Sequence, residues 1–385
     1  MSNSALMLFL QAEKQGRYGI PITFPATPYQ LLDVKDRARV QEGDRLRCEV
    51  SHFEPFTFIF AFIEESPCPE QMIALAQRLS QLDETGQIAF EGLVAKENAM
   101  GLGENPLERL ITLAYNTDDC DVYPGICHHE DLGHHYVNNG QYTPAKDIPE
   151  ELLPMLNYEV IGKAMSDAEG GILTPKGYVI PPSELKEVPW NTPIIPDYAI
   201  LLELSLAEHK TQLKLPSSPA EMDSALDRIE AESWSGAELH CLDCAAPTLV
   251  PHISSRDNIS HINRLAQQLW TMKDTELPKF KAVLDATKEH SVLGATRIAL
   301  HLDEYLFSPQ YIMPEDVAVE ALSIAVGTSQ VRSLLKHTDL RSYGRELIRQ
   351  EKASLTDYGL VAREDGQSLK PSLTQEIQPD MNEMT

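Results

Sequence analysis

The sequence predicts an α+β fold in which two similar units form an elongated tandem, each with small antiparallel sheets packed with helices plus a short helical segment. Three observations predict it. Stretches with the two-residue alternation of a strand lie beside stretches with the 3.6-residue period of a helix. Several motifs occur twice in the same order. At 385 residues, the chain is also long enough for more than one domain of ordinary size.

The first part of the first half, residues 1–67, mixes strands with one helix. Residues 6–10 and 20–24 are expected to be extended. Pro28 is expected to open a helix, because the fixed φ of proline suits the first helical turn. A further strand is expected from a row of alternating aromatic residues, which we interpret as core: Phe56, Phe58, Phe60 and Phe62.

The next two parts are residues 68–105, which read as helical, and residues 106–190. Apolar residues of the helical part fall on one side of a 3.6-residue period, and the part closes near residues 100–103. The third part is expected to end in a hairpin, because extended stretches flank the turn residues 175–177.

The second half repeats the order of motifs seen in the first. Pro-Ala-Thr-Pro at residues 25–28 corresponds to Pro-Ser-Ser-Pro at residues 216–219. Leu-Ala-Gln-Arg-Leu at residues 75–79 corresponds to Leu-Ala-Gln-Gln-Leu at residues 265–269. The third match pairs the hairpin motif at residues 173–179 with a similar motif at residues 355–361. An internal duplication is therefore predicted.

The second half is expected to contain the same three parts, at residues 191–258, 259–294 and 295–366. Closely spaced prolines between residues 181 and 196 suit an extended connector and mark the seam between the halves. Residues 367–385 have few large apolar side chains, and we expect a disordered tail there.

The charge balance favours a basic protein partner over nucleic acid. The chain has 58 Asp and Glu against 32 Lys and Arg, which gives a net charge of −26. A protein that binds phosphates directly needs a basic surface, so no direct nucleic-acid binding is expected. The 6 cysteines are too few for a disulfide scaffold, and no stretch resembles an export signal or a membrane span. A cytoplasmic protein without membrane contact is expected.

Residues 117–159 form the most one-sided stretch of the sequence, and we call it the acidic segment. Lys146 is its only basic residue other than histidine. A net charge of −26 corresponds to about 44 Å of duplex DNA, or roughly 13 base pairs, so the magnitude suits a DNA mimic. The candidate partner-binding residues are Asp118, Asp119, Asp121, Glu130, Asp131, Asp147, Glu150, Glu151 and Glu159.

Several motifs resemble those of ArdA antirestriction proteins. Ile-Pro-Glu-Glu-Leu at residues 148–152 and the later Leu-Asn-Tyr and Ile-Gly-Lys runs resemble the C-terminal region of that family. Tyr-Gly-Arg-Glu-Leu at residues 343–347 resembles the Tyr-Gly-Arg-Asp-Leu signature of that family. Residues 117–123 resemble the acidic Asp-Cys-Asp motif of the family. The resemblance assigns fold-holding or interface roles to five residues: Leu156, Tyr158, Gly162, Tyr343 and Gly344.

The resemblance implies an acidic DNA mimic of a mobile genetic element or phage that blocks the DNA-binding channel of a type I restriction-modification enzyme. ArdA proteins act as dimers of one unit. Two units in one chain imply an intramolecular pseudo-dimer or a unit whose diverged second half serves another contact, and a homodimer of the chain is the remaining alternative. The alternative target is another DNA-handling immune complex such as a CRISPR effector, whose channel is equally basic. No enzyme activity and no cofactor are expected.

A metal-binding enzyme is a second alternative, because thiolates and imidazoles are the usual zinc donors. Their spacing in this sequence matches no standard zinc motif. The pair Cys241 and Cys244 lacks a second Cys-x-x-Cys and a thioredoxin-like context, so we interpret it as incidental. The candidate ligands are Cys120, Cys127, His128, His129, His134 and His135.

Overall fold

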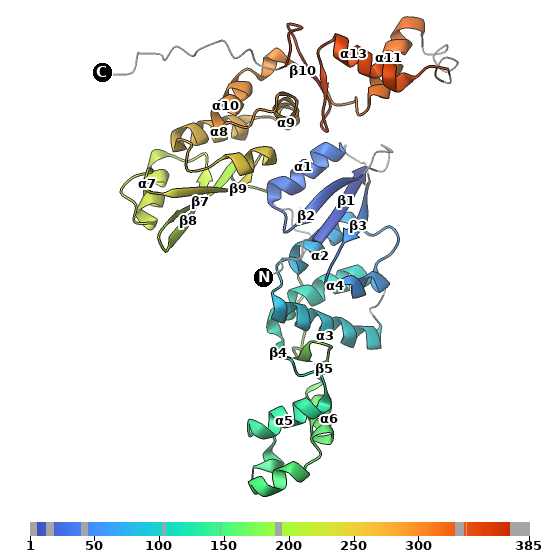
Figure 1. The fold of residues 1–385 in the computed structure, drawn as a ribbon, viewed down its shortest axis with the longest axis vertical. Helices are drawn as coiled ribbons and strands as arrows, with labels where there is room; N and C mark the ends of the chain where they lie inside the picture. Colours follow the sequence, from blue (N-terminus) through green and yellow to red (C-terminus); the bar gives the residue numbers. More distant parts are fainter. Residues whose placement is uncertain are drawn as a thin grey trace. The chain divides into compact units, whose positions relative to one another are not determined.

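The computed structural model has a mixed α+β fold, and its described residues include four three-stranded antiparallel sheets (Figure 1). The chain divides into two compact units. Unit 1 comprises residues 1–26 and 42–194, and unit 2 comprises residues 27–41 and 195–385. The structure describes residues 6–12, 19–39, 45–101, 103, 105–146, 148–188, 195–327, 335 and 337–369.

Unit 1 begins with a sheet whose central strand is β1 (Leu6–Ala12). It pairs with β2 (Ile20–Phe24) on one side and with β3 (Leu46–His52) on the other. Alternate residues of β1 are buried, as expected for a sheet with one face on the core. The two strands expected at residues 6–10 and 20–24 are confirmed.

The aromatic row after this sheet does not form a strand. Residues Thr57–Phe62 form the 3-10 helix η1. The fully buried residues here are Phe53, Phe56 and Ile59, whose three-residue spacing matches the period of a 3-10 helix. Phe60 is 43% exposed, so the prediction of a strand with one continuous core face was wrong. Phenylalanines occur at every second position in the sequence, but the buried residues occur at every third position.

Three helices follow in unit 1: α2 (Pro69–Leu79), α3 (Glu84–Met100) and α4 (Pro106–Tyr115). The predicted apolar stripe is buried, including Met72 and Leu75. Helix α3 ends where the sequence indicated, because Gly101 adopts a positive φ of 87° that stops the helix.

The last part of unit 1 is a short sheet and a pair of helices. Strand β6 is central and pairs with β4 and β5, so the hairpin predicted around residues 175–177 is confirmed. Helices α5 and α6 pack against each other. The bounds are η2 (Thr117–Asp119), β4 (Asp121–Pro124), α5 (His129–Asn138), η3 (Thr143–Ala145), η4 (Glu150–Met155), α6 (Tyr158–Glu169), β5 (Ile172–Leu173) and β6 (Gly177–Ile180).

Unit 2 contains a helix from early in the chain, α1 (Pro28–Ala38), together with everything after residue 194. The expected helix start at Pro28 is confirmed, but the helix belongs to unit 2 although the sequence grouped it with residues 1–67. The central strand of the first sheet of unit 2 is β7, paired with β8 and β9. These strands are β7 (Ile200–Leu206), β8 (His209–Leu215) and β9 (Glu238–Cys244).

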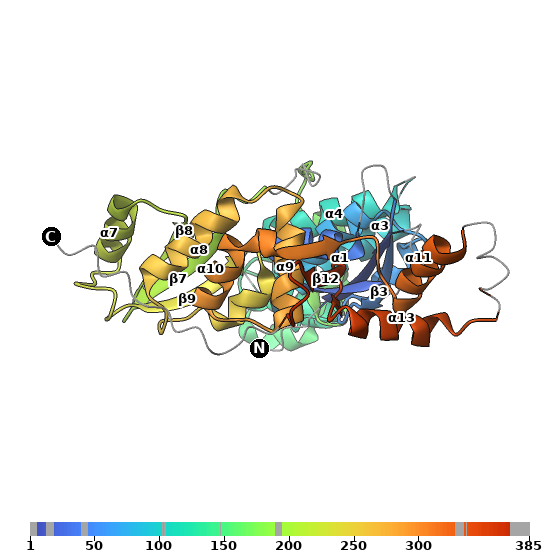
Figure 2. The same ribbon diagram turned by 90° about the horizontal axis from the view of Figure 1, so that it is seen from above.

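Helices cover this sheet and lead to the second one in unit 2. Helix α8 lies beside α10 in both views (Figures 1 and 2). The remaining elements are α7 (Pro219–Arg228), η5 (Pro247–His252), α8 (Ile259–Thr271), α9 (Glu276–Thr287), α10 (Val292–Leu300), η6 (Leu302–Glu304), β10 (Tyr305–Ser308), α11 (Pro314–Val326), α13 (Leu340–Gln350), β11 (Ser354–Leu355) and β12 (Leu360–Arg363).

The C-terminal end of unit 2 differs from the expected tail at one position. Leu369 is 6% exposed and belongs to the core of the unit, although a tail was predicted from residue 367. Residues 370–385 of the expected tail lie outside the described residues. Within the described chain, no helix is both long enough and apolar enough to cross a bilayer.

Among the described residues, the order of strands and α-helices from β1 to β6 occurs again from β7 to β12, while η3 and η4 have no described counterpart. The strand order β2-β1-β3 corresponds to β8-β7-β9, and β4-β6-β5 corresponds to β10-β12-β11. Helices α1 and α7 both begin with a capping box, formed by Thr27 in one and Ser218 in the other. Thr174 and Thr356 bind the facing glycine of their hairpins in the same way.

Candidate acidic interaction site

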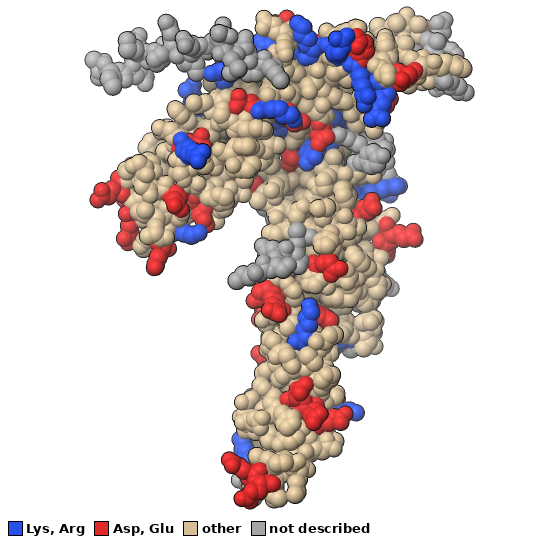
Figure 3. All heavy atoms as spheres, viewed as in Figure 1, with Lys and Arg blue, Asp and Glu red and all other residues tan. Residues whose placement is uncertain are grey.

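The carboxylates of the acidic segment lie at the surface of unit 1. Each of the eight described members is exposed, and Asp147 lies outside the described residues. They come from η2, β4, α5, η4 and α6. In Figure 3, acidic side chains predominate over basic ones at the lower end of the visible face, where Figure 1 places α5 and α6.

Two of these carboxylates are held in ion pairs. Arg78 of α2 approaches Asp118 to 2.8 Å and also donates to the carbonyl oxygen of Ala114. Lys186 approaches Asp119 to 2.7 Å. Because a cation of the same chain already neutralises each of them, they contribute less to any external cation site. Sequence reasoning missed both pairs, since Arg78 and Lys186 lie far from their partners along the chain.

The other six described carboxylates have no ion pair with any described residue. Glu130 and Asp131 lie in the first turn of α5, and Glu159 lies in the first turn of α6. Asp121 lies on β4, while Glu150 and Glu151 begin η4.

Close packing of α5 on α6 brings the acidic first turns of both helices together. A Cβ atom added at Gly162 would lie 1.8 Å from the carbonyl oxygen of His129. One added at Gly133 would lie 1.9 Å from the carbonyl oxygen of Tyr158. Only glycine permits this approach of the two backbones. The N-terminal turns that carry Glu130, Asp131 and Glu159 therefore lie next to each other.

Tyr158 connects η4 to the same helix pair. Its hydroxyl donates to the carbonyl oxygen of Leu153 over 3.0 Å, and its ring stacks on His134 with centroids 3.6 Å apart. Leu156 is half-buried. These contacts place Glu150 and Glu151 on the same part of unit 1 as the acidic helix turns.

The corresponding residues of unit 2 lie in an equivalent helix crossing. Gly344 of α13 is buried, and a Cβ atom added there would lie 1.8 Å from the carbonyl oxygen of Pro314 in α11. Tyr343 beside it is 37% exposed. The first turn of α11 is acidic, as that of α5 is, but the second helix of the pair differs in charge, because α13 carries Arg341, Arg345 and Arg349 along its length.

The acidic segment perturbs a neighbouring thiol. The pKa of Cys120 is raised to about 11, first because the thiol is partly buried and then because Asp119, Asp121 and Asp118 surround it. The thiolate form, which binds metals, is therefore disfavoured at neutral pH.

The histidines near the acidic segment take part in aromatic contacts. The ring of His135 meets Tyr123 edge-on at 4.9 Å, and His134 stacks on Tyr158. Cys127 donates to the carbonyl oxygen of Pro175. His128 is exposed, and one ring nitrogen of His129 is buried without a hydrogen-bond partner among the described residues. Within the part of the chain that the structure describes, no three or more His, Cys, Asp or Glu residues form a group that could hold a metal ion.

The pair Cys241 and Cys244 lies on β9, inside the core of unit 2. Both thiols are free and buried. Burial, together with Asp243, raises the pKa of Cys241 to about 12, and burial raises the pKa of Cys244 as well. Protonated, inaccessible thiols are poor nucleophiles.

No protein-family model matches the chain, and no curated protein matches it in sequence.

Proposed function

We propose that this protein is a non-catalytic, acidic DNA mimic of the ArdA-like antirestriction kind, which binds the DNA-binding channel of a type I restriction-modification enzyme and blocks it. The observation that carries the proposal is the grouping of exposed carboxylates, without ion pairs to described residues, around the α5 and α6 crossing. Lysines and arginines that line a DNA channel would pair with such carboxylates as they pair with phosphates.

The physical basis of binding is exchange of one set of anions for another. Duplex DNA releases condensed counterions when a protein neutralises its phosphates, and this release makes binding depend steeply on salt. A compact carboxylate cluster on a chain with a net charge of −26 competes for the same cations. Inhibition should therefore weaken as ionic strength rises.

The repeated order of elements supports a tandem of two ArdA-like units that arose by duplication. We infer that one chain takes the place of a dimer of single units, as a covalent pseudo-dimer. Mass measurement at micromolar concentration tests this: the mass of one chain is expected, and a stable dimer would contradict it.

The test of function compares two variants that lose six negative charges each. The first changes Asp121, Glu130, Asp131, Glu150, Glu151 and Glu159 to Asn or Gln. The control changes six exposed carboxylates of unit 2 in the same way: Glu208, Asp223, Asp227, Glu232, Glu238 and Asp303.

Inhibition of a type I enzyme should weaken about a hundredfold in the first variant, from roughly 0.5 kcal/mol for each exposed pair. The control should inhibit like the parent, and duplex DNA should compete with the parent in a pull-down. Equal loss in both variants would indicate a general charge effect, and no loss in the first would exclude the acidic segment as the binding site. If the pull-down captured a CRISPR effector instead, the target would change, but the protein would still be a DNA-mimicking inhibitor.

A further inference from the structure

Helix α1 is an early part of the chain that completes the later unit. Residues 27–41 belong to unit 2, whereas residues 26 and 42 belong to unit 1. The helix contacts β9 and η5, and Tyr29 lies in the core cluster of unit 2. The order of elements gives α1 the same place in the first half that α7 has in the second.

The first turn of α1 is held by Asp243 of β9, which is 1% exposed. Its carboxylate accepts hydrogen bonds from the Thr27 hydroxyl at 2.5 Å, the Tyr29 backbone N–H at 3.3 Å and the Tyr198 hydroxyl at 2.9 Å. The Tyr29 hydroxyl donates in turn to the carbonyl oxygen of Tyr198. The Cys244 backbone N–H also donates to this carboxylate, at 3.0 Å, so removal of α1 would take away two of its four donors.

The middle of α1 supplies the counterions of a buried lysine. Lys281 of α9 is 2% exposed, and its ammonium group lies 3.0 Å from Asp33 and 2.8 Å from Asp36. The Tyr358 hydroxyl donates, over 2.8 Å, to the same Asp33 oxygen that Lys281 approaches. An unpaired ammonium in such a site is strongly destabilising, because a buried charge needs a partner.

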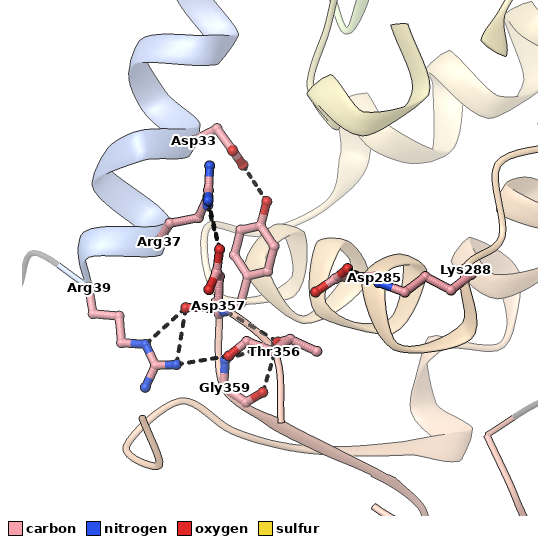
Figure 4. Close-up of polar contacts among 9 residues, drawn as sticks. Asp33, Arg37, Arg39, Asp285, Lys288, Thr356, Asp357 and Gly359 are labelled. Atoms are coloured by element: carbon pink, nitrogen blue, oxygen red, sulfur yellow. Dashed lines mark hydrogen bonds and ion pairs between the residues drawn. The ribbon is translucent and has the colours of Figure 1, made fainter. Parts of the chain in front are cut away.

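The end of α1 binds the turn between β11 and β12 (Figure 4). Arg37 pairs with Asp357 at 2.6 Å. Arg39, in the left-handed conformation that ends the helix, donates to the carbonyl oxygens of Pro309, Tyr311 and Thr356, among others. Positions from one end of α1 to the other therefore satisfy polar groups of unit 2.

Helix α7 shows that these contacts are particular to α1. Its residues Asp227 and Arg228 correspond to Asp36 and Arg37, and Glu230 has the same left-handed conformation as Arg39. Asp227 and Arg228 of α7 and Glu230 just after it are all exposed, and α7 packs on β8. Unit 2 thus contains two helices of one type, its own and one that the first half contributes.

We infer that α1 is an obligate element of unit 2, held by polar groups of β9, α9 and the turn between β11 and β12. A chain segment that starts at the proline-rich junction lacks a helix that this unit requires. Unlike the proposed function, this inference rests on buried groups and involves none of the exposed carboxylates of unit 1.

Hydrogen exchange on the full chain tests the inference. Lys281→Met removes the buried cation and leaves Asp33 and Asp36 without their counterion. Protection of amides in α1, β7 and β9 should fall at least about tenfold, while protection in β1 and β2 stays within about twofold. The control is Lys288→Met, because Lys288 lies at the end of α9, is 72% exposed and pairs with Asp285 (Figure 4).

A triple variant keeps the test decisive if Lys281→Met folds poorly. Adding Asp33→Asn and Asp36→Asn removes the unpaired carboxylates and should restore most of the protection, because a neutral cluster no longer contains a buried charge. If the amides of α1 exchange at the same rate as those of β1 and β2, and that rate does not change in Lys281→Met, α1 does not belong to unit 2. Failure of the triple variant to recover would exclude the ion cluster as the link.

Discussion

Gly162 and Gly344 show how single residues determine the helix crossings. At each position a methyl group would overlap a backbone carbonyl oxygen of the facing helix. Gly162→Ala and Gly344→Ala should each lower the free energy of unfolding by about 1–3 kcal/mol, because the helices must separate to admit the methyl group. Urea denaturation measures this.

Gly236 offers a control for both substitutions. A Cβ atom added there would lie 3.7 Å from its nearest neighbour, which is ordinary van der Waals contact. Gly236→Ala should change stability by less than about 0.5 kcal/mol. A similarly small effect at Gly162 would contradict the tight crossing that groups the acidic helix turns.

The cysteines should differ in reactivity according to burial. Cys68 is exposed, whereas Cys48, Cys241 and Cys244 are buried. Burial raises the pKa of Cys48 and of Cys241 to about 12, so little thiolate forms at neutral pH. Iodoacetamide should modify Cys68 first and reach the buried thiols only after denaturant is added. Mass spectrometry measures the rate of modification at each cysteine. If Cys241 and Cys244 reacted as fast as Cys68, their thiols would be accessible, and a redox role for the pair would be supported.

The β5–β6 and β11–β12 hairpins have the same hydrogen-bond pattern in their turns. The hydroxyls of Thr174 and Thr356 each donate to a glycine carbonyl oxygen and accept a backbone N–H. Thr174→Val and Thr356→Val should each lower stability by about 1–3 kcal/mol, because a buried backbone N–H loses its acceptor. Thr248→Val is the control, since Thr248 is exposed on η5. Thermal melts that show a loss at one hairpin alone would contradict their equivalence.

Local patterns explain which elements could be predicted from the sequence. Strands β1 and β2, the helix start at Pro28 and the hairpin after Thr174 follow from alternation, proline geometry and turn residues within a few positions. Helix η1 could not be predicted in this way, because Phe53, Phe56 and Ile59 become the buried set only when the surrounding residues are in place.

The candidate site was only partly predictable for the same reason. Composition identified the carboxylates of residues 117–159, and every described one is exposed. Their grouping depends on Gly133 and Gly162, whose close backbone contacts no local pattern reveals. The membership of α1 in unit 2 depends on Lys281, which is 245 residues from Asp36 along the chain.

For the whole molecule, acidity should affect stability partly through Asp36. Burial raises the pKa of Asp36 above its ordinary value, although Lys281 lowers it. The folded state therefore holds this proton more tightly than the unfolded state. The free energy of unfolding of the parent, minus that of Asp36→Asn, should rise as pH falls from neutral through the folded pKa toward the ordinary value.

Urea denaturation of both proteins across the acid range measures that difference. Asp227→Asn is the control, because Asp227 holds the corresponding place on α7 and is exposed. The free energy of unfolding of the parent, minus that of Asp227→Asn, should not rise in the same way as pH falls. A difference between the parent and Asp36→Asn that falls on acidification would mean that Lys281 outweighs burial.

The placement of α1 also bears on synthesis at the ribosome. Arg37 leaves the ribosome 320 residues ahead of Asp357, and Asp33 leaves it 325 residues ahead of Tyr358. A growing chain must therefore carry this helix without the last of its partners, Asp357 and Tyr358, until nearly all of the protein has been translated. Premature termination anywhere before residue 281 would release a product in which Asp33 and Asp36 lack the ammonium group that neutralises them, a defect that marks it for proteolysis in the cell.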